Sequence, residues 1–536
     1  MRPAEFGPSD KYSKRAAHCI MAAMAYDVIV IGAGIGGLGC AAKLARNGCR
    51  VLVLEKNNHI GGTSSVFRRD GFTFPMGPLS FSFPGRVKNF LSEVGIETEI
   101  SFHRNHFQLI SPDLDIIYSS PLETLKRDLQ QAFPQERTGL ESFFSEFKGI
   151  IREIQDIPHW HPDYLPGPAK RKSDEKDGRG LRRLARVREY SRTFCRRLLE
   201  RHLGDRRLRN FLGSQGTSEP EMAVLTLALM WNMMSEVGIW FPSCGIEGLS
   251  DLLAGAVKRS GGEIRLGAGV ERILLERGRV VGVRTDSGEG FLAPAVVSNA
   301  DAKKTFLELC APADIPRDWL DRLGSVPYTG SELCVYLGID PGRVDWRRLR
   351  ATHLFYRHRQ GQPGEEERDL EDFENREFEI CRWSDNAPNH VPPAKASLIL
   401  RVGFPYDHFA RFRTGEKKRK EDYKTYKMGL AGKLVATAEH VLPGLPSAVE
   451  WIEAATPLTY ADWGRRYRGS IAGWTWSAEY GRAFERKLLV ETPIENLFLA
   501  GIYAATELFL GGVPTALHTA DLAARLILGK THPGSG

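Results

Sequence analysis

Several features that would assign this chain to a familiar class are missing from its sequence. No run of 18 apolar residues occurs, so no membrane-spanning helix is predicted. Residues 1–25 are basic and lack the apolar core of a secretory signal, so we expect a disordered N-terminal extension. The eight cysteines include no C-x-x-C pair and no zinc-like spacing, which predicts reduced thiols in a cytoplasmic protein.

The motifs of common hydrolases and metalloenzymes are missing as well. The sequence has no Ser-His-Asp order, no H-E-x-x-H and no metal-ligand cluster, so no metal site is predicted. The net charge of +7 is small for 536 residues, and nucleic-acid binding is not expected. A hydrophobic fraction of 42% is typical of a globular protein, and the length suffices for two or three domains.

The stretch from Tyr26 to Gly62 has the pattern of a βαβ unit. The apolar runs Val28–Ile31 and Val51–Leu54 have the length and β-branched content of buried parallel strands. Between them, Leu38–Asn47 is predicted to be a helix that ends before Gly48. A first strand that leads directly into a helix is a common place for a phosphate to bind.

Glycines at this junction specify a dinucleotide. Gly32, Gly34 and Gly37 form G-x-G-x-x-G, whose glycines allow a tight turn, close approach of the pyrophosphate and close packing of helix on strand. Gly36 is the remaining glycine of this candidate phosphate loop. Glu55 ends the second strand, where its carboxylate can accept hydrogen bonds from a ribose diol.

The residues that follow identify the dinucleotide. Gly61, Gly62 and Thr63 begin "GGTSSVFRRDGFTFPMGP", which resembles the extended dinucleotide motif of flavoproteins in the amine oxidase and phytoene desaturase superfamily. The resemblance implies FAD rather than NAD, with Lys56 among its contacts. Thr63 stands where this superfamily often has a basic residue.

Two later segments resemble the same FAD fold. Gly261–Asp301 contains a predicted hairpin with its turn at Arg277-Gly278 and a buried strand at Ala295–Ser298, and the resemblance places Val270 against the adenine. Asn496–Ile527 resembles the carboxy-terminal flavin motif of phytoene desaturases, carotenoid isomerases and retinol saturases. In that motif the backbone of a strand–glycine turn and of a helix start faces the flavin, here at Gly501, Gly512 and Val513.

The expected fold is therefore α/β, with a Rossmann-like FAD-binding domain of the glutathione reductase type and a discontinuous α+β substrate domain. After the extension 1–25, the FAD-binding domain is predicted over residues 26–85, 241–310 and 493–530, and the substrate domain over 86–240 and 311–492. No second G-x-G-x-x-G follows a strand, so no separate nicotinamide domain is expected. NAD(P) or a quinone would then act as electron partner at the substrate cleft or the flavin edge.

The resemblance implies an FAD-dependent oxidoreductase acting on CH–CH or C=C bonds of a long apolar polyene or isoprenoid. Desaturation, saturation and isomerisation remain open, because they differ only in how the electrons are returned. Tyr503, Glu507 and His518 are the candidate catalytic residues near the ring. One alternative is a flavin-dependent reductive cyclase of a polyketide-derived polyene. Another is a non-catalytic prenyl-lipid escort protein, against which the intact glycine motif argues.

Two charged stretches bear on partners. Lys170–Asn210 is rich in arginine with leucines interleaved, which suits a basic amphipathic helix on an anionic membrane surface, although a solvated helical face is the alternative. The acidic stretch Gly364–Glu379 is predicted to be only a solvated excursion. The sequence leaves the oligomeric state open.

Overall fold

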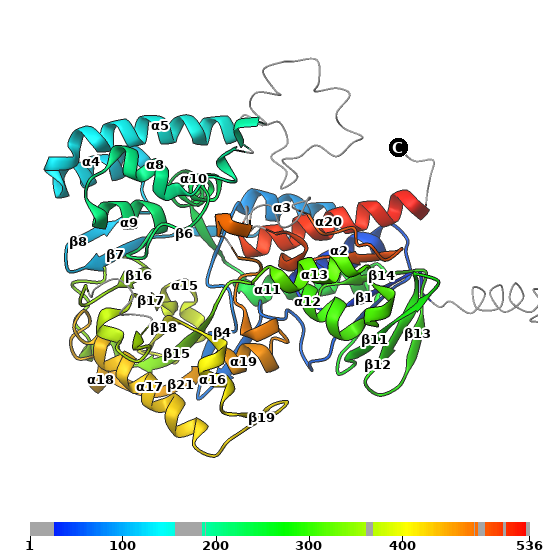
Figure 1. Cartoon of the computed structure of the whole chain (residues 1–536). Helices are drawn as coiled ribbons and strands as arrows, with labels where there is room; N and C mark the ends of the chain where they lie inside the picture. The colour runs from blue at the N-terminus through cyan, green and yellow to red at the C-terminus, as the bar shows by residue number, and fades with distance from the viewer. Residues whose placement is uncertain are drawn as a thin grey trace, which may run out of the picture.

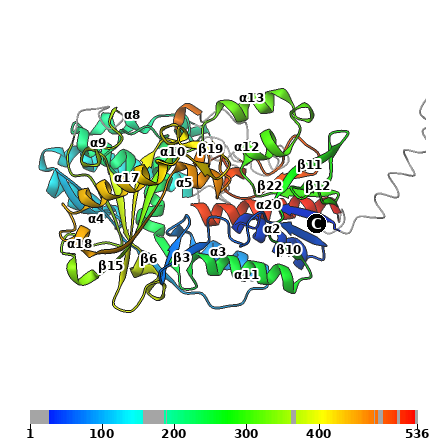
Figure 2. The ribbon, with the colours of Figure 1, turned by 90° about the horizontal axis from the view of Figure 1, so that it is seen from below.

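A computed structural model describes residues 26–155, 185–187, 189–360, 368–475, 477–480, 488–506 and 511–531. The predictions for residues 1–25, for Glu507 and for the first part of the arginine-rich stretch lie outside these ranges. Two halves lie side by side in both ribbon views (Figures 1 and 2). One half is built on a small parallel sheet, and the other on a larger mixed sheet beneath a helical layer. The α/β class predicted from the sequence is confirmed.

The smaller half contains a five-stranded sheet whose strands are all parallel. Its strands come from three distant parts of the chain, in the order β10 (Glu263–Arg265), β2 (Val51–Leu54), β1 (Val28–Ile31), β14 (Ala295–Ser298) and β22 (Leu497–Leu499). Every residue of β1, β2 and β14 is buried, as expected for strands covered on both faces. Three predicted strands are thus confirmed with their exact bounds.

Helix α2 (Ile35–Arg46) connects β1 to β2 and packs against α11 (Gly245–Arg259) and α20 (Gly512–Thr531). The predicted start at Leu38 is wrong by three residues, because the helix begins directly after Gly34. Glycine has a low helix propensity, so the sequence pattern placed the two glycines of the first turn outside the helix. The helix start predicted at Gly512 and Val513 is confirmed, because α20 begins at Gly512.

The predicted hairpin is also present. Strands β11 (Val270–Glu276) and β12 (Arg279–Thr285) pair antiparallel, and β13 (Gly290–Leu292) adds a third strand before the chain enters β14. Both turn residues have positive φ, 51° at Arg277 and 77° at Gly278. A two-residue turn of this kind matches the right-handed twist of the two strands.

The larger half contains a seven-stranded sheet whose two faces differ. Its order is β21 (Val449–Ala455), β15 (Ser331–Ile339), β18 (Ala396–Phe404), β17 (Phe378–Arg382), β16 (His353–Tyr356), β7 (Phe107–Ser111) and β8 (Leu114–Ile117). Alternate residues such as Leu333 and Val335 form an apolar core with helix α17 (Tyr423–Ala438). The residues that alternate with these along β15, such as Glu332 and Tyr336, lie on the other face of the sheet, which lines the cavity described below.

The expectation that Gly364–Glu379 is only a solvated excursion is wrong at its end. Strand β17 begins at Phe378, and the Glu379 side chain is only 12% exposed. Its charge is balanced by Arg401 on the neighbouring strand β18, a partner that local composition does not reveal.

A helical layer covers one end of this sheet (Figure 1). It consists of α4 (Leu122–Ala132), α5 (Arg137–Gln155), α8 (Cys195–His202), α9 (Arg206–Ser214) and α10 (Val224–Asn232). Helix α10 is almost entirely buried, so this apolar segment is a core helix. Among the described residues, no helix is long and apolar enough to cross a membrane.

The remaining elements lie outside these sheets and the helical layer. The strands are β3 (Val66–Arg69), β4 (Phe72–Pro75), β5 (Phe81–Ser82), β6 (Phe102–Asn105), β9 (Ile239–Pro242), β19 (Arg413–Gly415) and β20 (Lys418–Arg419). The helices are α3 (Pro84–Glu93), α12 (Ala302–Lys304), α13 (Arg317–Ser325), α15 (Trp383–Asn386), α16 (Tyr406–Ala410), α18 (Leu445–Ala448) and α19 (Pro457–Asp462).

Candidate functional site

The carboxylate of Glu55 is fixed at the end of β2 by two backbone groups. Ala33 donates its N–H to Oε2 at 2.8 Å, and Asn57 donates its N–H to Oε1 at 2.9 Å. The residue is 5% exposed, and that exposed part belongs to the wall of a cavity. Each carboxylate oxygen has a second lone pair, so Glu55 can still accept hydrogen bonds from the two hydroxyls of a ribose.

Two glycines of the phosphate loop stand where no side chain fits. A Cβ on Gly37 would lie 2.0 Å from the carbonyl oxygen of Gly32, and a Cβ on Gly36 would lie 2.7 Å from Cα of Gly501. The first approach lets α2 pack on β1, as the motif predicts. The second brings the carboxy-terminal segment against the phosphate loop. Gly61 completes the loop by donating its N–H to the carbonyl of Ala33 at 2.8 Å.

Asn299 was not found by sequence reasoning, although its side chain lies between the phosphate loop and Gly501. Its Oδ1 is 2.5 Å from the position of a Cβ on either Gly36 or Gly501, and its Nδ2 is 2.7 Å from that of a Cβ on Gly34. Asn299 directly follows β14, as Glu55 directly follows β2. The carboxyl ends of neighbouring parallel strands share one edge of a sheet, and this signal would have identified the residue.

Arg466 was missed for a different reason. Its Nη2 donates to Oγ1 of Thr63 at 2.8 Å, and its Nη1 donates to the carbonyl of Ile471 at 2.6 Å. A guanidinium therefore lies beside the double-glycine segment, at Thr63, where the flavoproteins that the sequence resembles often carry a basic side chain. The two residues are 403 positions apart in the chain, so no local pattern connects them.

Lys56 contributes a charged side chain to the site. Its Nζ donates to the carbonyl oxygen of Trp463 at 3.1 Å. Burial, with a further contribution from the nearby Arg465, lowers the pKa of Lys56 to about 7. A lysine that loses its proton near neutral pH gives this edge of the site a charge that depends on pH.

One cavity of about 1360 Å³ joins these groups. Most of the predicted site residues line it: Gly32, Gly34, Gly36, Glu55, Lys56, Gly61, Gly62, Thr63, Val270, Gly501, Tyr503, Gly512 and Val513. Gly37 and His518 do not, since Gly37 serves packing and His518 lies farther along α20. Pockets for one ligand are usually about 300–1,000 Å³, so this cavity has room for a cofactor and a second molecule.

The carboxy-terminal segment lines the cavity with Gly501, Tyr503 and the first residues of α20. Thr519 Oγ1 accepts the N–H of Gly501 at 2.9 Å, and α20 begins at Gly512, which lines the cavity together with Val513. The first N–H groups of a helix have no acceptor within the helix. Tyr503 is buried, and burial raises the pKa of its hydroxyl, so the phenol stays protonated. Trp474 fixes this turn by donating Nε1–H to the carbonyl of Tyr503 at 3.0 Å.

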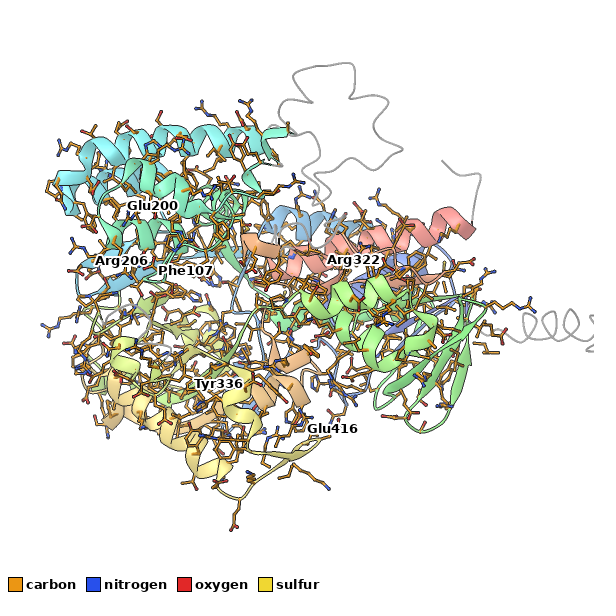
Figure 3. The ribbon with its side chains drawn as sticks, in the orientation of Figure 1. Phe107, Glu200, Arg206, Arg322, Tyr336 and Glu416 are labelled. Atoms are coloured by element: carbon orange, nitrogen blue, oxygen red, sulfur yellow. The ribbon has the colours of Figure 1, made fainter. Side chains whose placement is uncertain are left out.

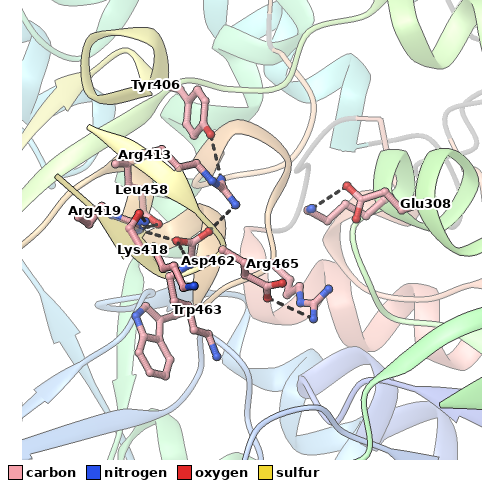
Figure 4. Close-up of polar contacts among 12 residues, drawn as sticks. Glu308, Tyr406, Arg413, Lys418, Arg419, Leu458, Asp462, Trp463 and Arg465 are labelled. Carbon is pink, nitrogen blue, oxygen red and sulfur yellow. Dashed lines mark hydrogen bonds and ion pairs between the residues drawn. The ribbon is translucent and has the colours of Figure 1, made fainter. Parts of the chain in front are cut away.

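The rim of the cavity is basic and carries an exposed aromatic ring (Figure 4). Asp462, almost fully buried, pairs with Arg413 at 2.8 Å and with Arg419 at 2.5 Å, which ties the β19–β20 hairpin to α19. The ammonium of Lys417 lies 4.5 Å from the ring centroid of Trp463, a residue that is 60% exposed. Positive charge and an amphipathic ring therefore meet at the entrance.

The residues fit FAD. The glycine loop, in which a side chain would not fit, leaves room for a pyrophosphate. The oriented carboxylate of Glu55 is an acceptor for the ribose. The N-terminus of α20 offers N–H donors for the flavin end. Among the described residues there is no group of three His, Cys, Asp or Glu side chains that could hold a metal ion.

The comparisons with known proteins agree with this site. The model of the flavin containing amine oxidoreductase family matches residues 35–528, and the chain belongs to that family. It is accordingly an FAD-dependent oxidoreductase.

Curated relatives match almost the whole chain. A zeta-carotene-forming phytoene desaturase of Myxococcus xanthus is 29% identical over 94% of each chain. An all-trans-retinol 13,14-reductase of Danio rerio is 23% identical and covers 94% of this chain and 86% of its own length. Among solved structures, a putrescine oxidase variant has a TM-score of 0.62 at 16% identity, with 94% of this chain and 99% of that chain covered, which shows the shared fold.

Proposed function

We propose that this protein transfers hydride between FAD and carbon–carbon bonds of a long apolar polyene or isoprenoid. The main observation in support is that the cavity continues past the proposed FAD-binding residues and over one face of the seven-stranded sheet. Phe67, Phe107 and Tyr336 line this continuation, and Tyr336 meets Phe67 edge to face at 4.9 Å between centroids. Phe107 and Tyr336 both come from strands of that sheet (Figure 3).

The relatives support this substrate class. Those named above act, by their names, on phytoene and on all-trans-retinol, and a Daucus carota relative, 28% identical over 90% of this chain, is named prolycopene isomerase. The parallel sheet and its glycine loop support a Rossmann-like FAD-binding domain of the glutathione reductase type. We propose that the seven-stranded sheet with its helical layer is the substrate domain.

The cofactor and the residues of the cavity have different roles in the proposed reaction. FAD, when bound, accepts or returns hydride. The chain excludes water with its aromatic wall and orients the substrate along it. Tyr503 is the candidate group for holding a proton at the cavity wall, because the residue lines the cavity and its phenol stays protonated. NAD(P) or a quinone would have to reach the same cavity as electron partner.

Product mass tests this function. Purified holoenzyme, oxidised or reduced without oxygen, is mixed with carotenoids, retinoids and polyketide-derived polyenes. We expect loss of two hydrogens for desaturation, gain of two for saturation, or an unchanged mass with a new isomer. Loss of polyene absorbance together with ring formation would identify the reductive cyclase instead. If only amines are converted, the substrate class proposed here is wrong.

We also propose that the protein is cytoplasmic and contacts a membrane surface at the cavity entrance. Trp463 and Lys417 at the rim have the chemistry of interfacial anchors, and Lys418 adds a further exposed cation. Several arginines of the described part of Lys170–Asn210 are paired with carboxylates, among them Arg201 with Glu146. The rim is therefore the better supported of the two basic surfaces.

A further inference from the structure

The cavity face of the seven-stranded sheet carries a cluster of charged side chains that the proposed reaction does not use. Arg401 on β18 lies between two carboxylates on the neighbouring strands, Glu332 on β15 and Glu379 on β17. Its Nε and Nη2 lie 3.0 and 2.8 Å from Oε2 of Glu332, and its Nη1 lies 3.3 Å from Oε2 of Glu379. All three residues line the cavity.

Two further side chains hold the carboxylates in place. His353 Nδ1 lies 2.6 Å from Oε1 of Glu379, and the hydroxyl of Tyr460 donates to Oε1 of Glu332 at 2.7 Å. His353 in turn stacks on Phe107 with 4.5 Å between ring centroids. The cluster is therefore a polar patch held by hydrogen bonds, and the rings of Phe107 and Tyr336 line the cavity beside it.

Arg401 has N–H groups that its two carboxylate partners do not use. A guanidinium has five N–H hydrogens, and the contacts above use three of those of Arg401. The other two have no partner among the described residues. The side chain is 24% exposed, and because Arg401 lines the cavity, its free N–H groups can reach a molecule there.

The charges of the patch limit what that molecule can be. Burial opposes ionisation of Glu379, but the neighbouring Arg401 and His353 outweigh it and lower its pKa, so the carboxyl is ionised. Two carboxylates then flank one guanidinium, and a carboxylate ligand would be repelled. A pure hydrocarbon would cover Arg401 without replacing its lost hydrogen bonds to water, and a buried donor left without a partner is unfavourable. A hydroxyl can accept from Arg401 and donate to a carboxylate.

We infer that Glu332, Glu379 and Arg401 form a subsite that binds a hydroxyl group of the polyene substrate. This inference rests on the proposed function and narrows it, since it selects polyene alcohols over hydrocarbons and acids. The subsite belongs to the seven-stranded sheet and the phosphate loop to the parallel sheet, so the hydroxyl anchors the substrate at a part of the cavity away from the pyrophosphate.

Binding to the holoenzyme tests the subsite. Three polyenes of equal chain length, a hydrocarbon, its primary alcohol and its carboxylate, are titrated without oxygen while the flavin spectrum is followed, with each affinity corrected for partition into detergent. We expect the alcohol to bind at least tenfold more tightly than either of the others. Equal binding of the hydrocarbon and the alcohol would overturn the subsite and leave the proposed function standing. Failure of all three to bind or react would overturn both.

Substitutions localise the preference. Glu379→Gln keeps the shape of the side chain and removes its charge, and we expect the tenfold preference for the alcohol to fall below threefold. Glu450→Gln is the matched control, because Glu450 lies on β21 of the same sheet and pairs with Lys395 at 2.6 Å outside the cavity lining. An unchanged preference in Glu379→Gln would overturn the assignment. The comparison of ligands on the unmodified protein remains decisive if that variant does not fold.

Discussion

Replacing Glu55 with glutamine tests the adenosine end of the FAD site without changing the rest of the cavity. In the protein, both carboxylate oxygens accept backbone N–H groups, those of Ala33 and Asn57. The amide of a glutamine would turn its NH₂ toward one of these donors in either orientation, so one hydrogen bond is lost. The ribose also loses an ionised acceptor.

The size of the effect follows from these contacts. A hydrogen bond to a charged group contributes about 1.5–3 kcal/mol. Since about 1.4 kcal/mol is a tenfold change, the Kd for FAD should rise about 10- to 150-fold. Reconstitution of the FAD-free protein, followed by quenching of flavin fluorescence, measures this directly. Glu97→Gln is the control, because Glu97 is exposed and is not among the residues that line the cavity.

FMN provides the test that could refute the reasoning. It lacks the adenosine ribose, so its affinity should be equal in wild type and Glu55→Gln. A Kd for FAD within twofold of wild type would show that Glu55 does not bind the ribose. An equal loss for FMN and FAD would show that the substitution displaces the whole phosphate loop.

Three further predictions concern packing, pH and membrane contact. Gly37→Ala should destabilise the folded protein by about 1–3 kcal/mol, measured by thermal unfolding, because the new Cβ would meet the carbonyl of Gly32 at 2.0 Å; an unchanged Tm would contradict the packing role. Lys56→Met should raise the Tm of the FAD-free protein at pH 6.5, and the gain should shrink toward pH 10. The folded pKa of Lys56 is depressed, so the buried charge is lost above about pH 7 while the unfolded chain keeps its proton; a gain independent of pH would refute this. Trp463→Ser combined with Lys417→Glu should reduce cosedimentation with anionic liposomes at low salt, and unchanged binding would exclude the rim as the contact.

The parts of the fold that local sequence determines were predicted well. β1, β2 and β14 have their expected bounds because a buried parallel strand between turns is a short apolar run. The hairpin at Arg277-Gly278 and the helix start at Gly512 follow from turn and helix-start chemistry in the same way.

The parts of the site that the sequence did not predict depend on contacts between distant segments. Arg466 reaches Thr63 across most of the chain, and Glu379 belongs to a stretch whose composition indicates a solvated loop. The pairing of Glu379 with Arg401 arises only when β17 and β18 become neighbours. Asn299 is the exception, because its position directly after a predicted parallel strand would have identified it as a site residue from the sequence.

The central claim is that this FAD enzyme exchanges hydride with a polyene, and one measurement tests it most directly. The holoenzyme is mixed with a polyene in the absence of oxygen, in both the oxidised and the reduced form, and the flavin absorbance is recorded through a single turnover. We predict that the oxidised flavin bleaches with a donor polyene or that the reduced flavin recovers its absorbance with an acceptor polyene. An isomerase would convert the polyene only with reduced flavin and return it unchanged. No conversion of any polyene by either form, with rapid bleaching by a primary amine, would contradict the account.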